Sequence, residues 1–321
     1  MERRWCRSTP NLVPDTIAVA LIGWLARVLD RTDGPALASR RPPPSSQGGN
    51  IDFSRRLGYV GEVQALDASD TSGKRLSVVI PAFNEADRLG PTLERVTSFL
   101  AGARRWRPAE ILVVDDGSSD LTAELARSHT VIEGVDLAVA VHPVNRGKGA
   151  AVRTGFSRSS GEWVLLTDAD MSAPIEDLTV LAAAAGPDAV AVGSRAVDRR
   201  LVTERQPLHR DLMGRTFNLA IRALGLTRLS DTQCGFKLFP GDLARRLASA
   251  QQLDGFSFDV ELLVLARHWG YHVEEVGVHW QHVEASRVMA IRHSSQMLRD
   301  ALKLWWWRTS RRLPAEPRGV S

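Results

Sequence analysis

The sequence is poor in cysteine and has no long apolar run. Cys6 and Cys234 are its only cysteines and provide no disulfide framework, which favours a reducing, cytoplasmic setting. A helix that spans a bilayer needs about 20 apolar residues, whereas the best candidate, residues 16–29, is shorter and already includes Arg27. No cleavage site of a secretory signal follows this segment. We interpret it as a short amphipathic helix or as translated sequence upstream of the true start, with a weak membrane anchor as the less favoured alternative.

Two common nucleotide-binding motifs are also missing. The segment NRGKG at 145–149 is not a P-loop, because His142 stands where a glycine is required and no Ser or Thr follows Lys148. It is not a dinucleotide fingerprint either, since Val152 occupies the third glycine position. We expect a turn that opens a helix, with Gly147 and Gly149 allowing the backbone to approach a ligand closely. Lys148 either reaches a phosphate or lies in solvent.

A histidine metal site is not expected. His268, His272, His279 and His282 are closely spaced, but Gly270 should end the helix that carries the first of them. His268 and His272 would then share no helical face.

Positive charge and tryptophan are concentrated near the C-terminus. The net charge is only +4, yet residues 287–321 contain eight Lys and Arg against two acidic residues. Trp305, Trp306 and Trp307 are adjacent and therefore cannot all face one core. Tryptophan beside arginine suits the headgroup region of a membrane. We expect the helices at 294–308 and 208–224 to contact a membrane, with burial in the core or in a dimer as the alternative; no nucleic-acid-binding module is present.

Apolar runs alternate with helical patterns from Leu76 onward. This pattern predicts an α/β fold with a mostly parallel sheet covered by helices on both faces. The expected strands are 76–81, 110–115, 136–141, 162–168 and 188–194, and the expected helices between them include 86–100, 150–158 and 175–185. After Arg195 we expect helices at 208–224, 258–269 and 294–308, and strands within 230–239 and 272–280. The predicted regions are a poorly ordered leader (1–75), an α/β domain (76–287) and a basic, Trp-rich helix and tail (288–321).

Three acidic turns follow strands of this sheet, at the edge where parallel sheets bind ligands. They are PAFNEAD (81–87), VVDDGSSD (113–120) and TDADMSAP (167–174). A single turn of this kind could simply cap a helix, but three at one edge are hard to explain by capping. Asp168 and Asp170 provide hard oxygen ligands that suit Mg²⁺ or Mn²⁺ shared with substrate phosphates.

These segments resemble the GT-A glycosyltransferases of family 2, and most of all the dolichyl-phosphate glucosyltransferase branch. The resemblance covers roughly two-thirds of the chain, and DTQCGFK favours the glucosyl over the mannosyl branch. The matching stretches are VVIPAFNE, VVDDGSSDLT, NRGKGAAVRTG, LLTDADMSAP, VGSR, DTQCGFKLF and FDVELL.

The resemblance implies a role for each matching position. It implies a nucleotide pocket, a metal-held diphosphate, two arginines for an acceptor phosphate, and a carboxylate that binds sugar hydroxyls or orders those arginines. The nucleotide pocket would be lined by Pro81, Ala82, Glu85, Asp115 and Asp116, and the metal would be bound by Asp168 and Asp170. The acceptor phosphate would be bound by Arg195 and Arg210, and the further carboxylate would be Asp259 or Glu261. The last two have helix capping as an equal alternative.

Three positions depart from the family pattern. Ser172 replaces a metal-binding Gln of mannosyl relatives, Gly214 replaces a serine that assists the arginines, and VEASRV (283–288) has Ala285 and Arg287 in a Gly-Ser-Lys motif. The resemblance therefore implies a thinner or wetter metal shell and a phosphate held without the assisting serine.

The implied activity is inverting transfer of a hexose onto polyprenyl or dolichyl phosphate, with UDP-glucose as the expected donor. The enzyme would act at the cytoplasmic face of a membrane as a peripheral protein and give a β-linked product. The alternatives are a transferase that uses GDP-mannose, one that acts on a soluble glycan, or a non-catalytic nucleotide-sugar binder. A binder would tolerate the loss of Asp168 or Asp170.

Overall fold

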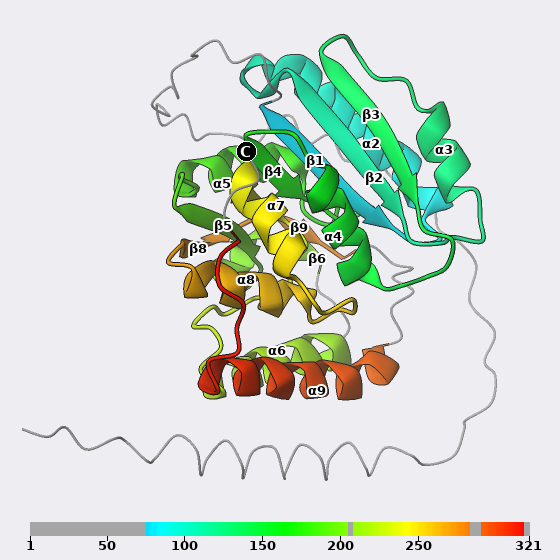
Figure 1. The fold of residues 1–321 in the computed structure, drawn as a ribbon. Helices are drawn as coiled ribbons and strands as arrows, with labels where there is room; N and C mark the ends of the chain where they lie inside the picture. Colours follow the sequence, from blue (N-terminus) through cyan, green and yellow to red (C-terminus); the bar gives the residue numbers. More distant parts are fainter. Residues whose placement is uncertain (1–74, 205–207, 283–289, 318–321) are drawn as a thin grey trace, which may run out of the picture. The chain divides into compact units, whose positions relative to one another are not determined.

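The computed structural model describes residues 75–204, 208–282 and 290–317. Most of the predicted leader and the whole VEASRV segment lie outside the described residues, so the proposed region boundaries stay predictions. Within the described part, the predicted α/β architecture with a mostly parallel sheet is confirmed (Figure 1).

Seven strands form the central sheet in the order β3-β2-β1-β4-β7-β5-β8. β1 pairs in parallel with β2 and β4, β2 with β3, and β5 with β8, whereas β7 runs antiparallel between β4 and β5. The strands are β1 (Leu76–Ala82), β2 (Ala109–Asp115), β3 (Val135–Val141), β4 (Trp163–Leu166), β5 (Ala189–Ser194), β7 (Lys237–Pro240) and β8 (His272–Gly277).

Helices cover both faces of this sheet, and β1 is therefore buried on both of its faces. Val78 and Ile80 pack into the core beneath α2 (Ala86–Gly102) and α5 (Leu178–Ala184), while Val79 faces α4 (Lys148–Arg158), α7 (Gly241–Ala250) and α8 (Phe258–His268). α3 (Thr122–Ser128) packs beside α2. Alternating side chains of one strand therefore supply both cores.

Several boundaries differ from the sequence prediction. The helix expected at 175–185 begins as a 3₁₀ turn, η3 (Ile175–Asp177), and the strand expected at 272–280 divides into β8 and β9 (Trp280–Gln281). β9 pairs with β6 (Val202–Glu204), and two further 3₁₀ turns are η2 (Arg104–Trp106) and η4 (Arg199–Leu201). α7 was not predicted. As expected, α8 ends at His268 and Gly270 follows with φ of 94°.

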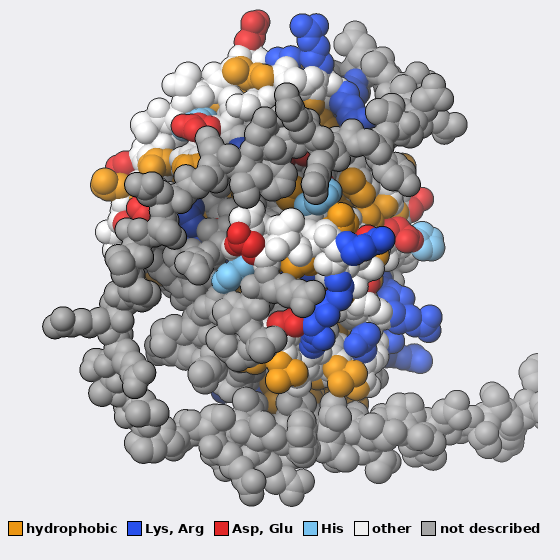
Figure 2. All heavy atoms as spheres, turned by 180° about the vertical axis from the view of Figure 1, so that it is seen from behind, with side chains coloured by type: hydrophobic (Ala, Val, Ile, Leu, Met, Phe, Trp, Pro, Cys, Tyr) orange, Lys and Arg blue, Asp and Glu red, His pale blue; other side chains and the backbone are white. Residues whose placement is uncertain are grey.

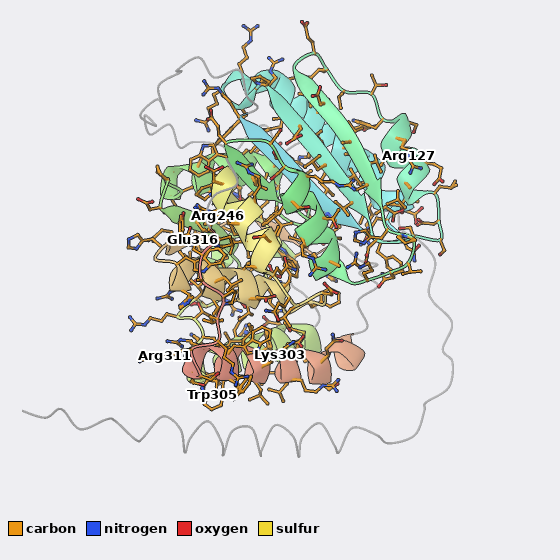
Figure 3. All side chains as sticks on the ribbon, viewed as in Figure 1. Arg127, Arg246, Lys303, Trp305, Arg311 and Glu316 are labelled. Carbon is orange, nitrogen blue, oxygen red and sulfur yellow. The ribbon has the colours of Figure 1, made fainter. Side chains whose placement is uncertain are left out.

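α6 (Leu208–Ala223) and α9 (Ala290–Thr309) lie side by side beyond α8 (Figure 1). The tail after α9 returns to the α/β core, where Trp269 Nε1 donates to the Pro314 carbonyl at 2.9 Å and Arg246 pairs with Glu316 at 3.1 Å. Figure 3 labels Arg246 and Glu316 at this junction. Of the helices described, none is both long and apolar enough to cross a bilayer.

Candidate active site

The acidic turn after β4 is held from three directions. Asp170 Oδ1 accepts hydrogen bonds from the Ser172 backbone N–H at 3.0 Å and from its hydroxyl at 2.9 Å. Thr92 of α2 donates to the Ala169 carbonyl at 2.7 Å, and Gln281 of β9 donates its N–H to the Ser172 carbonyl at 2.8 Å. These contacts place both carboxylates in one short turn at the carboxyl end of the sheet, as the sequence predicts.

Asp168 lies against a lysine on one side and a glycine on the other. Lys148, the first residue of α4, donates from Nζ to Asp168 Oδ1 at 2.5 Å. A Cβ on Gly235 would lie only 2.0 Å from Asp168 Oδ2 and 2.5 Å from Oδ1. Residue 235 must therefore lack a side chain for Asp168 to keep this position.

The electrostatic environment separates the two carboxylates. Burial alone would raise the pKa of Asp168, but the positive charges of Lys148, Lys237 and Arg195 outweigh burial and lower it. Burial and the negative charge of Asp168 together raise the pKa of Asp170, against the opposing hydrogen bonds from Ser172. Asp168 is thus strongly held as an anion inside a cluster of cations.

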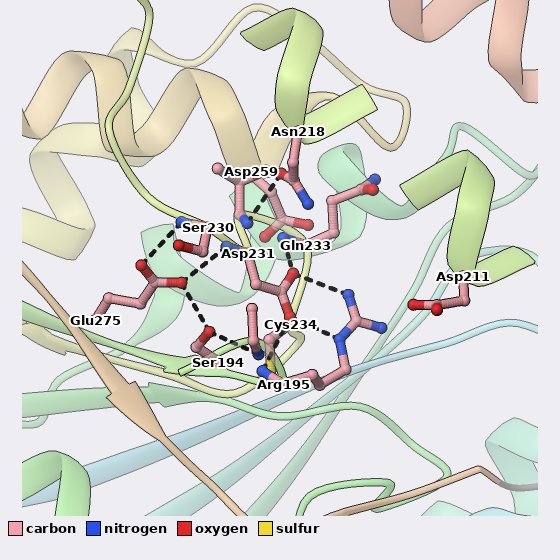
Figure 4. Close-up of polar contacts among 12 residues, drawn as sticks. Ser194, Arg195, Asp211, Asn218, Ser230, Asp231, Gln233, Cys234, Asp259 and Glu275 are labelled. Atoms are coloured by element: carbon pink, nitrogen blue, oxygen red, sulfur yellow. Dashed lines mark hydrogen bonds and ion pairs between the residues drawn. The ribbon is translucent and has the colours of Figure 1, made fainter. Parts of the chain in front are cut away.

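Arg195 follows β5 and is locked in a bidentate ion pair with Asp231 (Figure 4). Its Nε lies 2.6 Å from Asp231 Oδ2 and its Nη2 lies 2.8 Å from Oδ1. The guanidinium also lies over the Trp280 ring, 5.5 Å from the ring centroid. Although burial opposes ionisation of both groups, each charge shifts the other's pKa further: the pKa of Arg195 is raised and that of Asp231 is lowered.

Asp259 and Glu261 are occupied by contacts within the protein. Asp259 forms a fully buried ion pair with Lys237 Nζ, which also donates to the Cys234 carbonyl at 2.6 Å. Glu261 accepts the N–H groups of Gln252 and Leu253 at 2.8 Å each. Neither carboxylate contacts Arg195 in the described hydrogen bonds; the residue that orders this arginine is Asp231.

The first two acidic turns interlock beside the third. Asn84 Oδ1 accepts the Ser119 N–H at 2.8 Å, and the Glu85 N–H donates to Thr122 Oγ1 at 2.8 Å. Burial raises the pKa of Glu85, with the charges of Asp170 and Asp168 adding to the effect and Arg88 opposing it. Pro81 and Ala82 end β1 and are buried at this edge.

Asp115 and Asp116 stabilise the loops around them. Asp115 Oδ1 accepts the Ser118 N–H at 3.0 Å. Asp116 accepts the N–H of Arg146 at 3.0 Å and of Gly147 at 2.7 Å, and it lies 2.6 Å from His142 Nδ1. Asp116 therefore fixes the loop that leads to Lys148.

The glycines of NRGKG lie against a distant segment of the protein's own backbone. A Cβ on Gly147 would lie 2.4 Å from the Asp254 carbonyl oxygen, and one on Gly149 would lie 2.4 Å from the Leu253 carbonyl oxygen. The close approach that these glycines permit in this structure is to the protein's own backbone at 253–255; the expected approach to a ligand stays a prediction. Sequence spacing could not reveal a partner about 100 residues away.

Arg210 belongs to the first turn of α6, but its side chain lies outside the described part of the structure. Gly214 lies on the same helix, and a Cβ there would meet nothing within 4 Å.

The donor set at the β4 turn fits a hard divalent cation. Within residues 75–204, 208–282 and 290–317, no group of three or more His, Cys, Asp or Glu residues is arranged to hold a metal ion. Asp168 and Asp170 nevertheless provide two carboxylates at a ligand-binding edge, and Mg²⁺ commonly takes one or two carboxylates and completes its shell with substrate phosphates and water. The hydroxyl of Ser172 is directed to Asp170, as described above.

α6 and α9 expose apolar side chains among basic ones. Leu212 is 65% exposed, Leu219 51% and Trp306 45%, whereas Ile221 and Leu224, within the helix predicted at 208–224, are buried. Figure 2 shows Lys and Arg side chains gathered beside hydrophobic ones near the lower end of the view. The described exposed arginines of these helices and the following turn are Arg215, Arg222, Arg299, Arg308, Arg311 and Arg312.

Sequence comparison identifies the family. The model of a family described as Glycosyl transferase family 2 matches residues 77–247. The human dolichyl-phosphate β-glucosyltransferase is 35% identical over 245 residues, which cover 73% of this chain and 75% of that protein. The Drosophila melanogaster dolichyl-phosphate β-glucosyltransferase is 32% identical over 247 residues, covering 74% and 76%. The chain belongs to glycosyl transferase family 2 and is a glycosyltransferase, within the dolichyl-phosphate β-glucosyltransferase branch of that family.

Solved structures agree on the fold. Glucosyl-3-phosphoglycerate synthase from Mycobacterium tuberculosis, in complex with UDP, matches with a TM-score of 0.54 at 20% identity over 73% of this chain and 81% of that chain. Mannosyl-3-phosphoglycerate synthase from Rubrobacter xylanophilus matches with a TM-score of 0.52 at 18% identity over 75% and 76%. At these identities the likeness establishes the shared GT-A fold.

Proposed function

We propose that this chain transfers glucose from UDP-glucose onto a polyprenyl phosphate such as dolichyl phosphate, with inversion at the anomeric carbon. The observation that carries the proposal is the convergence of Asp168, Lys148 and Arg195 at the carboxyl end of the sheet, in a chain whose relatives are named for glucosyl transfer to dolichyl phosphate.

The donor would lie across all three acidic turns. Pro81, Ala82, Glu85 and Asp115 are proposed to line the nucleotide pocket, and Asp116 to hold its wall through the loop at 146–147. Lys148 is positioned to contact the diphosphate because its ammonium group already lies beside Asp168.

Asp168 and Asp170 would hold Mg²⁺ or Mn²⁺. Support comes from their donor set and from the related fold of the M. tuberculosis synthase, which has been crystallised with Mn²⁺ and UDP-glucose. Bound there, the cation would offset the negative charge that develops on the departing diphosphate. The turn fixed by Ser172 and Thr92 keeps both carboxylates at one place for this purpose.

The acceptor would be held by arginine. A lipid phosphate is largely ionised near neutral pH, since its second pKa is about 6, so it needs orientation more than deprotonation. Arg195 is proposed to orient it through charge-assisted hydrogen bonds, with Arg210 as the second arginine. The Nη1 group of Arg195 takes no part in the ion pair with Asp231. A phosphate oxygen would form the new bond to the anomeric carbon as the bond to UDP breaks, and the bonding pair would leave with UDP.

A membrane surface would present this acceptor. Trp306, Leu212 and Leu219 are exposed on the α6–α9 layer next to several arginines, the combination that suits a headgroup region with anionic lipid. Arg312 lies over the Trp306 ring at 4.4 Å, and Lys303 lies over the Trp307 ring at 4.5 Å. Figure 3 labels Lys303, Trp305 and Arg311 along this layer. The enzyme would then bind the membrane peripherally.

A donor panel tests the proposal. The purified full chain would be given polyprenyl phosphate and, in turn, UDP-glucose, UDP-N-acetylglucosamine and GDP-mannose with Mg²⁺ or Mn²⁺. We expect a glucosyl lipid from UDP-glucose alone, with a β-anomeric signal by NMR. Mannosyl lipid from GDP-mannose, or an α-linked product, would refute the proposal.

A further inference from the structure

We propose that Glu275 is a positioning residue for Arg195, acting from β8 through Asp231. The inference rests on the proposed function of Arg195 as the acceptor-phosphate residue. It concerns a carboxylate that lies outside the three acidic turns of the sequence and has no described hydrogen bond to the guanidinium itself.

One carboxylate binds both sides of the ion pair (Figure 4). Glu275 Oε1 accepts the Ser194 hydroxyl at 2.7 Å and the Asp231 N–H at 2.8 Å, while Oε2 accepts the Ser230 N–H at 2.8 Å. Ser194 directly precedes Arg195 in the chain. The backbone positions of the two partners of the ion pair, which are 36 residues apart in sequence, are therefore both fixed by the Glu275 side chain.

The pairing of β5 with β8 holds Glu275 in a fixed position beside Ser194. β5 and β8 are parallel neighbours, with Val192 opposite Glu275 and Ser194 opposite Gly277. Ser194 is fully buried, and its hydroxyl oxygen also accepts the Ala196 N–H at 3.1 Å. The backbone on both sides of Arg195 is thus fixed by a hydroxyl whose own orientation is set by Glu275.

The loop at 230–235, which Glu275 holds at Ser230 and Asp231, also contacts Arg195 and Asp168. Its Asp231 carboxylate accepts the Arg195 N–H at 3.2 Å as well as the bidentate contacts, and its Gln233 N–H donates to Asp231 Oδ1 at 3.1 Å. Farther along the loop, Gly235 lies against Asp168. Removing the negative charge of Glu275 weakens three hydrogen bonds at once, because bonds to an ionised acceptor are about twice as strong as neutral ones.

Glu275→Gln keeps the size of the side chain and removes its charge. Its matched control is Glu274→Gln on the adjacent, exposed position of β8, whose side chain points to the opposite face of the strand. We expect Glu275→Gln to raise the KM for polyprenyl phosphate by about tenfold, which corresponds to about 1.4 kcal/mol, and to leave the KM for UDP-glucose within about twofold. Glu274→Gln should match the wild type in both. A variant in which both KM values rise equally while the melting temperature falls has a general structural defect, and that result would overturn the inference.

A spectroscopic readout makes the test independent of turnover. The Arg195 Nε–H resonance of the ¹⁵N-labelled full chain, assigned by its loss in Arg195→Lys, reports directly on the bond to Asp231. We expect this resonance to shift or broaden in Glu275→Gln and to stay in place in Glu274→Gln. If the wild type transfers nothing to polyprenyl phosphate, the proposed function fails, and the resonance alone decides whether Glu275 positions Arg195. An unchanged resonance in Glu275→Gln would overturn the inference in either case.

Discussion

Replacing Gly235 by alanine should displace the carboxylate of Asp168. The added Cβ would lie 2.0 Å from Oδ2, 2.3 Å from Cγ and 2.5 Å from Oδ1, whereas ordinary contact begins near 3.4 Å. Because the methyl group meets the centre of the carboxylate, Asp168 has to move by more than an ångström. A misplacement of about 1 Å at a reacting centre costs about 100-fold in rate, and overpacking of this kind costs about 1–3 kcal/mol of stability.

The assay for Gly235→Ala combines turnover with metal binding. We expect kcat to fall by about 100-fold, Mn²⁺ affinity measured by titration calorimetry to fall with it, and the melting temperature to drop by only a few degrees. Gly102→Ala is the matched control, because a Cβ there meets nothing within 4 Å. Wild-type kcat and Mn²⁺ affinity in Gly235→Ala would refute the geometry argued for Asp168.

Three further predictions test other parts of the site. Asp170→Asn should abolish turnover while the protein stays folded by circular dichroism; full activity would rule out its metal role. Asp231 has a lowered folded-state pKa because Arg195 outweighs its burial, so its ion pair should stabilise the protein fully above the ordinary aspartate pKa and lose that effect as pH falls through the folded pKa. The difference in melting temperature between wild type and Asp231→Asn should therefore be constant near neutral pH and shrink below about pH 4; a difference that is unchanged in acid would contradict this. Trp306→Ser should weaken binding to anionic vesicles by roughly fivefold to tenfold, since burying half of a large aromatic side chain contributes about 1 kcal/mol. The control Val180→Ser on α5 should leave vesicle binding unchanged. Equal binding by both variants would count against the α6–α9 surface as the membrane contact.

The strands and the position of the acidic turns could be predicted because their signals are local. β1 and β2 are continuous apolar runs that end at a polar turn, and the structure places their ends within one residue of the prediction. The antiparallel direction of β7 has no such signal, since strand pairing depends on the path of the chain between β5 and β7. α7 could have been found from Leu243 and Leu247 at helical spacing. The Pro240–Gly241 start obscured it.

The residues that the sequence analysis missed are those defined by distant partners. Asp231 pairs with Arg195 across 36 residues, and Glu275 reaches Asp231 across 44. Gly235 is adjacent to Asp168 only because β7 lies beside β4 in the sheet. The motif DTQCGFK contains Asp231 and Gly235, so the right segment was singled out, but a single sequence does not state which side chains its residues contact.

The most direct test of the account is the location of Mn²⁺ in crystals of the full chain grown with UDP. Anomalous scattering from Mn²⁺ should give one strong peak within coordination distance of carboxylate oxygens of Asp168 and Asp170 and of a diphosphate oxygen, with the Arg195 guanidinium facing the same cleft. A peak at other residues, or a nucleotide bound with both carboxylates directed away from its diphosphate, would contradict the account.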